Sequence, residues 1–277
     1  GSEMCIRDRL QIMCGIAGFV NDMPIDVKCP VLQRMTDMIA HRGPDSEGHY
    51  IDEHAALGHR RLSIIDLGGG QQPIYNEDGS KVITFNGEIY NYQTLREELI
   101  AAGHTFTTKS DTEVLLHGYE QWGVDLLQRV RGMFTFVIWD KNKQELFGAR
   151  DHFGIKPFYY AKMNGTFMYA SEIKSLLRHP DFVKELNAEA LKPYMTFQYP
   201  AIGETFFKGV YKLPEGHYFT YRDGKMDIHR YYDEDFREGK QKLGELVNSI
   251  DQTVCDSVKA HQIADVEVGS FLSSGVD

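Results

Sequence analysis

The chain has 277 residues, enough for one large domain or for one domain and part of a second. Its 42% hydrophobic and 25% charged residues are typical of a globular protein, and its longest apolar run, Met133 to Trp139, is far too short to span a bilayer. The net charge of −10 (30 basic and 40 acidic residues), with no local basic patch, argues against nucleic-acid binding.

Met13-Cys14-Gly15-Ile16 has the character of a protein start behind a leader, residues 1–13, that is non-native or removed. Removal of Met13 would leave Cys14 with a free α-amine beside its thiol, which supplies a base and a nucleophile in one residue. An α-amine has an ordinary pKa of about 8, which suits proton acceptance near neutral pH. The alternative is a buried strand whose cysteine only packs. A secretion signal is disfavoured because no cleavage site follows the apolar run.

Hydrophobic periodicity in the first half of the chain predicts helices that alternate with short strands. The expected elements, in order, are a helix over 30–40, strands over 62–67 and 82–85, and a helix over 92–102 with Asn91 as its N-cap. Ser110 and Glu113 have the spacing of a capping box, which predicts that a third helix starts there.

The second half is rich in aromatic and β-branched residues, which favour strands. The predicted strands cover residues 134–139, 145–149, 157–162, 167–169, 217–221 and 225–231, with short helices over 172–177 and 188–194. Asn164-Gly165 and Asp223-Gly224 are strong signals for hairpin turns. The pattern predicts antiparallel sheets stacked with helices outside. A charged segment follows Tyr232, and then a helix over 244–260 and a strand over 266–272, so a domain boundary is expected near Tyr232.

The four cysteines have neither the spacing of metal ligands nor that of a disulfide framework: Cys5, Cys14, Cys29 and Cys255. We therefore expect no metal site and a reducing, cytoplasmic setting.

Five segments carry a resemblance in their order and spacing. They are Cys14-Gly15-Ile16, Arg42-Gly43-Pro44-Asp45, Arg61-Leu62-Ser63-Ile64-Ile65-Asp66, Asn86-Gly87-Glu88-Ile89-Tyr90-Asn91 and Ser110-Asp111-Thr112-Glu113. Together they resemble the class II glutamine amidotransferase domain of glutamine-dependent asparagine synthetases. The segments 150–157 (Arg-Asp-His-Phe-Gly-Ile-Lys-Pro) and 170–174 (Ala-Ser-Glu-Ile-Lys) extend the match over essentially all of residues 13–277.

The resemblance implies an α+β fold of the N-terminal-nucleophile hydrolase type, a four-layer αββα sandwich of two antiparallel sheets. It assigns residues 14–232 to a glutaminase domain. Residues 233–277 would be a linker and the truncated start of an α/β ATP-pyrophosphatase domain, which forms the synthetase half.

The same resemblance implies that Cys14 attacks the side-chain amide of glutamine and forms a thioester, with Asn86 and Gly87 as the oxyanion hole. Removal of one oxyanion donor typically lowers the rate a hundred- to a thousand-fold, roughly. Asn-Gly is also the strongest two-residue hairpin signal, so the alternative for Asn86-Gly87 is a turn. The segment Glu88-Ile89-Tyr90-Asn91 that follows favours the oxyanion site.

The resemblance places the remaining glutamine contacts on six residues: Arg61, Leu62, Ile64, Ile65, Glu88 and Asp111. The planar guanidinium of Arg61 suits the substrate carboxylate, although most arginines are simply exposed surface residues. Asp111 would hold the substrate ammonium group with Glu88 nearby. Asp111 also occupies the first turn of a predicted helix, where an acidic residue favours the helix dipole.

The last residues resemble the pyrophosphate loop of ATP pyrophosphatases, which has the pattern Ser-Gly-Gly-x-Asp-Ser. The implied nucleotide-binding residues are Leu272, Ser273, Ser274, Gly275 and Asp277. The segment is not a Walker A motif. It departs from the family pattern because Ser274 replaces a glycine, and because the sequence ends at Asp277 before the final serine.

We therefore expect the glutaminase half of an asparagine synthetase, with glutamine as substrate and no cofactor for glutamine hydrolysis. The full-length enzyme would also need ATP, Mg²⁺ and aspartate, and the resemblance allows a homodimer without a nucleic-acid or membrane partner. Two alternatives stay open. One is a synthetase-like amidotransferase with another acceptor, and the other is a non-catalytic interaction module whose amine the leader blocks.

Overall fold

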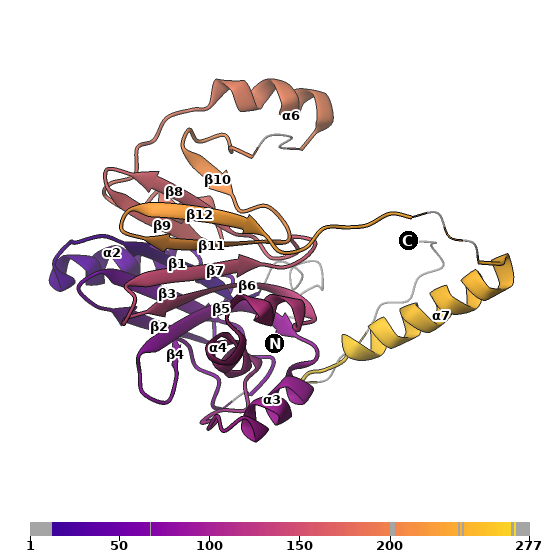
Figure 1. The fold of residues 1–277 in the computed structure, drawn as a ribbon. Helices are drawn as coiled ribbons and strands as arrows, with labels where there is room; N and C mark the ends of the chain where they lie inside the picture. The colour runs from indigo at the N-terminus through magenta and orange to yellow at the C-terminus, as the bar shows by residue number, and fades with distance from the viewer. Residues whose placement is uncertain are drawn as a thin grey trace, which may run out of the picture.

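The computed structural model describes residues 13–66, 68–199, 203–237, 239, 241–266 and 269. Two six-stranded sheets, each with antiparallel neighbours, form the centre of the molecule (Figure 1). In spatial order the first sheet contains β10 (Val210–Lys212), β8 (Tyr159–Met163), β9 (Thr166–Ala170), β1 (Gly15–Val20), β3 (Ala55–Arg61) and β2 (Ser46–Ile51). The second contains β12 (Lys225–Arg230), β11 (His217–Arg222), β7 (Glu145–Arg150), β6 (Gly132–Asp140), β5 (Lys81–Ile89) and β4 (Ile74–Tyr75).

Helices cover the outer face of each sheet, and three apolar clusters separate the four layers. On the first sheet lie α2 (Ile25–Asp37) and α5 (Ile173–Leu176), and on the second lie α3 (Tyr92–Ala101) and α4 (Asp111–Trp122). Between the sheets, the middle cluster includes Ile16, Leu57, Trp139, Phe167 and Phe219, all at most 1% exposed. The architecture is therefore the predicted αββα sandwich.

Strand β6 illustrates how the sequence specifies these layers. Phe134, Phe136 and Ile138 pack into the cluster beneath α3 and α4, whereas Val137 and Trp139 pack between the two sheets. Successive side chains of a strand point to opposite faces, so an unbroken apolar run is expected where both faces are covered. The strand is central in its sheet for this reason.

The predicted hairpin turns are confirmed. Asn164 and Gly165 connect β8 and β9 with φ angles of 49° and 82°, and Asp223 and Gly224 connect β11 and β12 with φ angles of 50° and 73°. Positive φ at both central positions matches the twist of the flanking strands, and Asn, Asp and Gly adopt it at least cost.

Helix α2 starts at Ile25, five residues before the predicted start at Pro30, and ends at Asp37 rather than Ala40. Lys28 in its first turns is buried, and its Nζ donates to the carbonyl oxygens of Asp52 and Glu53. This anchor stabilises the helix start, and Pro30 is accommodated inside the helix, where the sequence signal alone suggested a start.

The prediction of a strand over 62–67 is wrong for residues 62–66, and Leu67 lies outside the described residues. Strand β3 ends at Arg61, whose Nη2 donates to the carbonyl oxygens of Ile65 (3.1 Å) and Asp66 (2.5 Å). Asp66 has a φ of 52°. The hydrogen bonds of the guanidinium therefore hold residues 62–66 in a loop. The apolar residues of this segment alone do not predict that loop.

The predicted helix caps at Ser110, Glu113 and Asn91 are confirmed only for Ser110. Ser110 does cap α4, because its Oγ accepts a hydrogen bond from the Thr112 N–H at 3.2 Å. Glu113 does not complete a capping box; its carboxylate accepts from the backbone and hydroxyl groups of Thr107 and Thr108. Asn91 precedes α3, but its side chain bonds to the Arg129–Arg131 segment instead of capping the helix.

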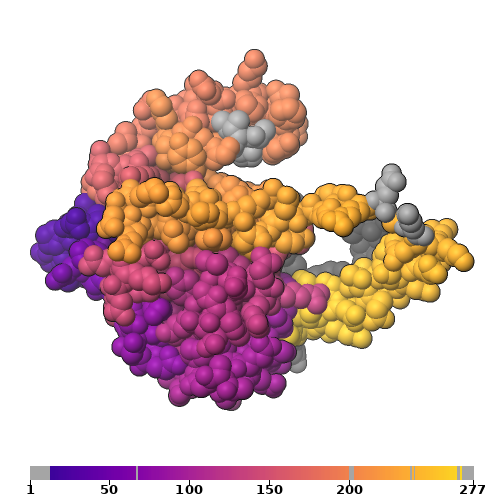
Figure 2. All heavy atoms as spheres, in the orientation of Figure 1, coloured from indigo at the N-terminus to yellow at the C-terminus, as the bar shows by residue number. Residues whose placement is uncertain are grey.

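Tyr231 and Tyr232 are still hydrogen-bonded to the sandwich at Gly216. Beyond them the chain leaves it, and helix α7 (Leu243–Ala260) projects from the sandwich (Figure 2). Val247, Ile250, Val254 and Val258 are each more than half exposed on this helix. Residues 261–265 then return to the sandwich, where Ile263 packs against the cluster beneath the second sheet. Short helices not yet named are η1 (Gly123–Gln128), η2 (Ala188–Ala190) and α6 (Leu191–Phe197). None of the helices in the described ranges has the length and hydropathy to cross a membrane.

The predicted strand over 266–272 lies largely outside the described residues. So do the predicted nucleotide-binding residues Leu272, Ser273, Ser274, Gly275 and Asp277. The domain boundary near Tyr232 falls between β12 and α7 and stays a prediction.

Candidate active site

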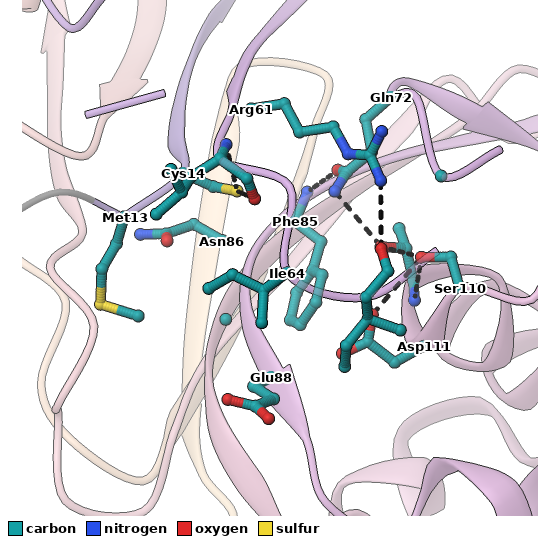
Figure 3. A pocket seen from close by; sticks show the side chains of 15 residues that line it. Met13, Cys14, Arg61, Ile64, Gln72, Phe85, Asn86, Glu88, Ser110 and Asp111 are labelled. Carbon is teal, nitrogen blue, oxygen red and sulfur yellow. Dashed lines mark hydrogen bonds between the residues drawn. The ribbon is translucent and has the colours of Figure 1, made fainter. Parts of the chain in front are cut away.

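A pocket opens where β1, the loop after β3, β5 and the start of α4 meet (Figure 3). All nine residues that we predicted for catalysis and glutamine binding line it: Cys14, Arg61, Leu62, Ile64, Ile65, Asn86, Gly87, Glu88 and Asp111. They come from four segments that span almost a hundred residues of sequence. The structure therefore brings the whole predicted set together.

Cys14 lies immediately before β1, with its thiol inside the pocket. The Sγ accepts a hydrogen bond from the Leu62 N–H at 3.3 Å and lies 3.5 Å from the Leu62 carbonyl oxygen. Arg42 holds the backbone on the other side, because its Nε donates to the Cys14 carbonyl oxygen at 3.2 Å. Burial raises the pKa of the thiol above its ordinary value despite the Leu62 hydrogen bond. The thiol therefore needs a base to become a nucleophile.

Asn86 lies within β5, where it pairs with Thr135 of β6, so the alternative of a hairpin turn at Asn86-Gly87 is wrong. The side chain is fully buried, and among the described residues neither atom of its amide has a hydrogen-bond partner. Figure 3 shows this amide beside Cys14. Buried amides are normally paired, so an unpaired one next to a nucleophile is available to a ligand.

Gly87 allows β5 and β6 to approach closely. A Cβ at this position would lie 2.2 Å from the Met133 carbonyl oxygen and 2.7 Å from the Phe134 Cα. No side chain fits there without backbone movement, so only glycine maintains the strand pairing next to Asn86.

The loop after β3 forms one wall of the pocket. Arg61 is 6% exposed, and its hydrogen bonds to the carbonyl oxygens of Ile65 and Asp66 fix both the guanidinium and the loop. Gly70 lies against this group, since a Cβ there would be 2.8 Å from Arg61 Nη2. The result is a fixed cation in the pocket, which suits a carboxylate.

Two carboxyl groups lie opposite this cation. Asp111 is 4% exposed, at the start of α4, and accepts hydrogen bonds from the Ile89 N–H (3.0 Å) and the Ser110 hydroxyl (3.4 Å). Burial raises the pKa of Asp111 to about 6 despite these bonds. Burial, with the Asp111 charge, raises the pKa of Glu88 to about 7. A buried carboxylate with a second, half-buried carboxyl group beside it suits an ammonium group.

The sequence motifs did not predict a role for two residues at or beside the pocket, Gln72 and Lys156. Gln72 accepts a hydrogen bond from the Phe85 N–H at 2.6 Å and donates to Thr112 Oγ1 at 3.2 Å, so it joins β5 to α4. Lys156 contacts Met13 beside the pocket. Neither residue belongs to a periodic pattern; Lys156 was part of a quoted motif without a role.

One group among the described residues could geometrically hold a metal ion, and it lies outside this pocket: Glu77, His104, His117 and Glu120, whose ligand atoms are within 4.8 Å of each other. Burial lowers the pKa of His117, but the Glu113 carboxylate 3.5 Å from its Nε2 and the Glu120 carboxylate hydrogen-bonded to its Nδ1 at 3.1 Å outweigh this effect and raise the pKa to about 9. A protonated imidazole thus serves as counter-ion to these carboxylates, which accounts for the cluster.

Comparison with known protein families gives a single assignment. The profile described as "Glutamine amidotransferase domain" matches residues 13–232.

Among curated proteins, glutamine-hydrolysing asparagine synthetase 1 of Bacillus subtilis is 45% identical over 96% of this chain, and asparagine synthetase 3 of the same organism is 36% identical over 96%. Amidase chry2 of Gibberella zeae is 35% identical over 96% of the chain. The chain covers 42%, 44% and 41% of these proteins, respectively, and so spans less than half of their length.

Solved structures agree on the fold. The structure of glutamine phosphoribosylpyrophosphate amidotransferase from B. subtilis aligns with a TM-score of 0.60 at 18% identity, and covers 80% of this chain and 50% of that one. A structure described as the allosteric regulatory enzyme of purine biosynthesis aligns with a TM-score of 0.58 at 19% identity. These alignments confirm the predicted α+β fold with two antiparallel sheets.

Proposed function

The chain belongs to the glutamine amidotransferase domain family, as its motifs indicated, and we propose that it hydrolyses glutamine to glutamate and ammonia. The observation that carries this proposal is the juxtaposition of the Cys14 thiol with the unpaired, buried Asn86 amide in one pocket. A nucleophile beside an idle hydrogen-bond donor is the arrangement that an acyl transfer requires.

The reaction would start with transfer of the Cys14 thiol proton to the α-amine of the same residue. The sulfur then attacks the side-chain carbonyl carbon of glutamine, and the carbonyl electrons move to the oxygen. Asn86 Nδ2 and the Gly87 N–H would stabilise this oxyanion. When the oxyanion collapses, the C–N bond breaks and the leaving nitrogen takes the proton from the α-ammonium, releasing ammonia. Water cleaves the thioester to give glutamate and the free thiol.

Glutamine would be held by its two charged ends. The Arg61 guanidinium would bind the α-carboxylate, and Asp111, with Glu88 nearby, would bind the α-ammonium. The walls formed by Leu62, Ile64 and Ile65 would orient the side chain between these ends. Fixing both ends of the substrate places its amide at the sulfur, which supplies much of the rate enhancement in such reactions.

This mechanism works only when Cys14 is the first residue, because a preceding peptide turns the amine into an amide. The test compares ammonia release from glutamine by a chain that starts at Cys14, by its Cys14→Ala variant and by the chain with residues 1–13 retained. We expect activity from the first alone. Equal ammonia release by the trimmed chain and its Cys14→Ala variant would remove Cys14 from the mechanism.

The proposed function and the non-catalytic alternative make different predictions for material made in cells. If the proposed function holds, N-terminal sequencing should find Cys14 at the start of the mature protein. A mature protein that retains the leader would support an interaction module with a blocked amine.

We further propose that the whole protein passes the ammonia to aspartate and makes asparagine in the cytoplasm. The similarity to asparagine synthetases supports this acceptor, and the three cysteines in the described ranges are free, as a reducing compartment favours. ATP and Mg²⁺ would activate aspartate as an adenylate at the loop of residues 272–277. Asparagine formation by the full-length protein with ATP, Mg²⁺, glutamine and aspartate is the test.

The similarity to an amidase keeps a second acceptor under consideration. Ammonia release from glutamine without asparagine formation by the full-length protein would favour an amidotransferase that acts on another acceptor. Pyrophosphate release during a screen of candidate carboxylic acids would then identify that acceptor.

A further inference from the structure

Lys156 is a buried cation beside the pocket that the mechanism above leaves without a role. The residue is 1% exposed. Its backbone is fixed on both sides, because its N–H donates to Asp151 Oδ2 at 2.9 Å and its carbonyl oxygen accepts from Arg150 Nε at 2.7 Å. The position of the side chain is therefore determined by the loop after β7 and does not depend on a surface contact.

The Lys156 ammonium points at the residue before the nucleophile. Its Nζ lies 2.6 Å from the Met13 sulfur, the only hydrogen-bond partner that it has among the residues the structure describes. A thioether is a weak acceptor and carries no charge. A buried cation is normally paired with an anion, and burial lowers the pKa of Lys156 to about 8. A buried ammonium with only a neutral partner destabilises the folded chain, which indicates that it serves the reaction.

Removal of Met13 would take away this contact and leave the ammonium without it, near Cys14, on whose thiol its charge already acts. Building on the function proposed above, we propose that Lys156 keeps the α-amine of Cys14 uncharged, so that the amine can accept the thiol proton. Lys156 acts through this base and does not touch glutamine, so it is a positioning residue for the reaction.

The physical basis is repulsion between like charges. A cation close to an amine disfavours the protonated form of that amine, and low polarity around both groups strengthens the effect. When the thiol proton reaches the amine, the resulting ammonium again lies near a cation. It therefore gives up this proton more readily to the leaving nitrogen of glutamine. The repulsion thus keeps the amine free before the reaction and assists the second transfer, to the leaving nitrogen, without any net change of charge on Lys156. It does not favour the first transfer, which the same cation supports instead by lowering the pKa of the Cys14 thiol.

Other charged groups surround this pair. Arg42 and Arg61 are further cations whose charges act on Lys156 and on Cys14, respectively. Asp151, Glu88 and Asp111 oppose them. Arg42 also lies close to the terminus, because its Nε donates to the Cys14 carbonyl oxygen, but its guanidinium is paired with Glu172. Arg61 is held by the loop carbonyls, so Lys156 is the cation whose head group contacts residue 13.

The experiment is the pH dependence of kcat/KM for glutamine hydrolysis, from pH 5.5 to 9.5, in the chain that starts at Cys14. In the Lys156→Met variant the pKa of the amine returns toward its ordinary value, so the acid limb should move to higher pH by about one unit. Activity at pH 6 should fall about tenfold, while activity at pH 9 should stay within about twofold of the wild type. Lys156→Arg should restore the wild-type profile, because it keeps the cation.

Lys192→Met is the matched control, since Lys192 is exposed on α6, and its profile should not move. A second measurement does not depend on activity: the rate at which the terminal amine is acetylated, followed by mass spectrometry across the same pH range in trimmed chains carrying Cys14→Ser. Lys156→Met should shift that titration in the same direction.

An unchanged acid limb and an unchanged amine titration in Lys156→Met would overturn the inference. So would an equal loss of kcat/KM at every pH, with the amine titration unmoved, because that outcome assigns Lys156 a purely structural role. Failure of the proposed function is distinguishable, since the trimmed wild-type chain would then release no ammonia at any pH.

Discussion

Asn86 keeps a polar group in the interior at a cost. An unpaired buried amide destabilises a folded protein by about 1–3 kcal/mol. The position is central in β5, and both amide atoms lack partners among the described residues. Such a group is expected where the missing partner arrives with the substrate, as the oxyanion would in the proposed reaction. Stability and catalysis therefore make opposite demands on this residue.

Replacement of Asn86 should separate these demands. In the trimmed chain, Asn86→Ala should lower kcat by roughly a hundred- to a thousand-fold with little change in KM, because the donor acts on the oxyanion. The midpoint of thermal unfolding should fall only slightly or rise, since the variant also removes an unpaired amide. Steady-state kinetics and thermal unfolding measure the two effects. A large loss of stability with unchanged kcat would show that Asn86 serves the fold alone.

The two pocket carboxyl groups predict a pH dependence of glutamine binding. Asp111 must be ionised to attract the ammonium group, and its pKa of about 6 places the transition just below neutral pH. As pH falls through this value the carboxylate is protonated, so affinity should fall roughly tenfold between pH 7 and pH 5. Calorimetric titration of the trimmed Cys14→Ala chain with glutamine measures this. Asp111→Asn should bind weakly at every pH; a retained transition in that variant would assign the titration to Glu88.

At the scale of elements, the strand pair β5–β6 positions the proposed oxyanion site. The register sets Asn86 opposite Thr135 and Gly87 opposite Phe134. Because a Cβ at Gly87 would overlap backbone atoms of β6, the two strands must separate to accept any side chain. Separation of the strands would displace both the Asn86 amide and the Gly87 N–H from their positions beside Cys14.

Gly87→Ala should therefore reduce stability and activity in the same variant. We expect a loss of about 2 kcal/mol in unfolding free energy, which is typical of an overpacked core position, together with a large loss of kcat. Gly203→Ala is the control, since a Cβ there meets no atom within 4 Å. Urea unfolding and ammonia release measure both properties. Wild-type stability in Gly87→Ala would contradict the close approach of the strands.

The elements also show what the sequence could predict. The αββα layers follow from apolar runs such as residues 134–139, which need both faces covered, and the hairpin turns follow from Asn-Gly and Asp-Gly. The loop after β3 was predicted as a strand because Leu62, Ile64 and Ile65 are apolar. What bends it is the Arg61 guanidinium, a contact formed only in the folded chain.

The candidate site was found by motif order, not by periodicity. The nine residues meet because four distant segments end at one pocket, a fact of topology that no local pattern contains. Gln72 was missed for the same reason: its bonds to Phe85 and Thr112 join elements that lie far apart in the sequence. The spacing of Ser110 and Glu113 predicts a capping box, but the Glu113 carboxylate instead accepts four hydrogen bonds from the two threonines before the helix.

Across the whole molecule, the segment after α7 returns to the pocket that contains Cys14 and Arg61. The Asp265 N–H donates to the Ile64 carbonyl oxygen at 3.1 Å, and the Asp265 carboxylate accepts from the Asp66 N–H at 2.7 Å. Asp66 in turn holds the Arg61 guanidinium through its carbonyl oxygen. The C-terminal part of the chain thereby supports the loop that fixes the proposed carboxylate ligand, about two hundred residues earlier in the sequence.

Loss of the Asp265 carboxylate should loosen this loop without disturbing Cys14 or Asn86. Asp265→Ala should raise KM for glutamine about fivefold and leave kcat within about twofold, as expected for one exposed hydrogen bond to a charged group. Asp265→Asn keeps an acceptor oxygen and should give an intermediate KM. Asp251→Ala, an exposed change on α7, is the control, and its kinetics should match those of the wild type. An unchanged KM in Asp265→Ala would show that residues 261–265 pack against the sandwich without supporting the pocket, and that Arg61 is fixed by its own loop alone.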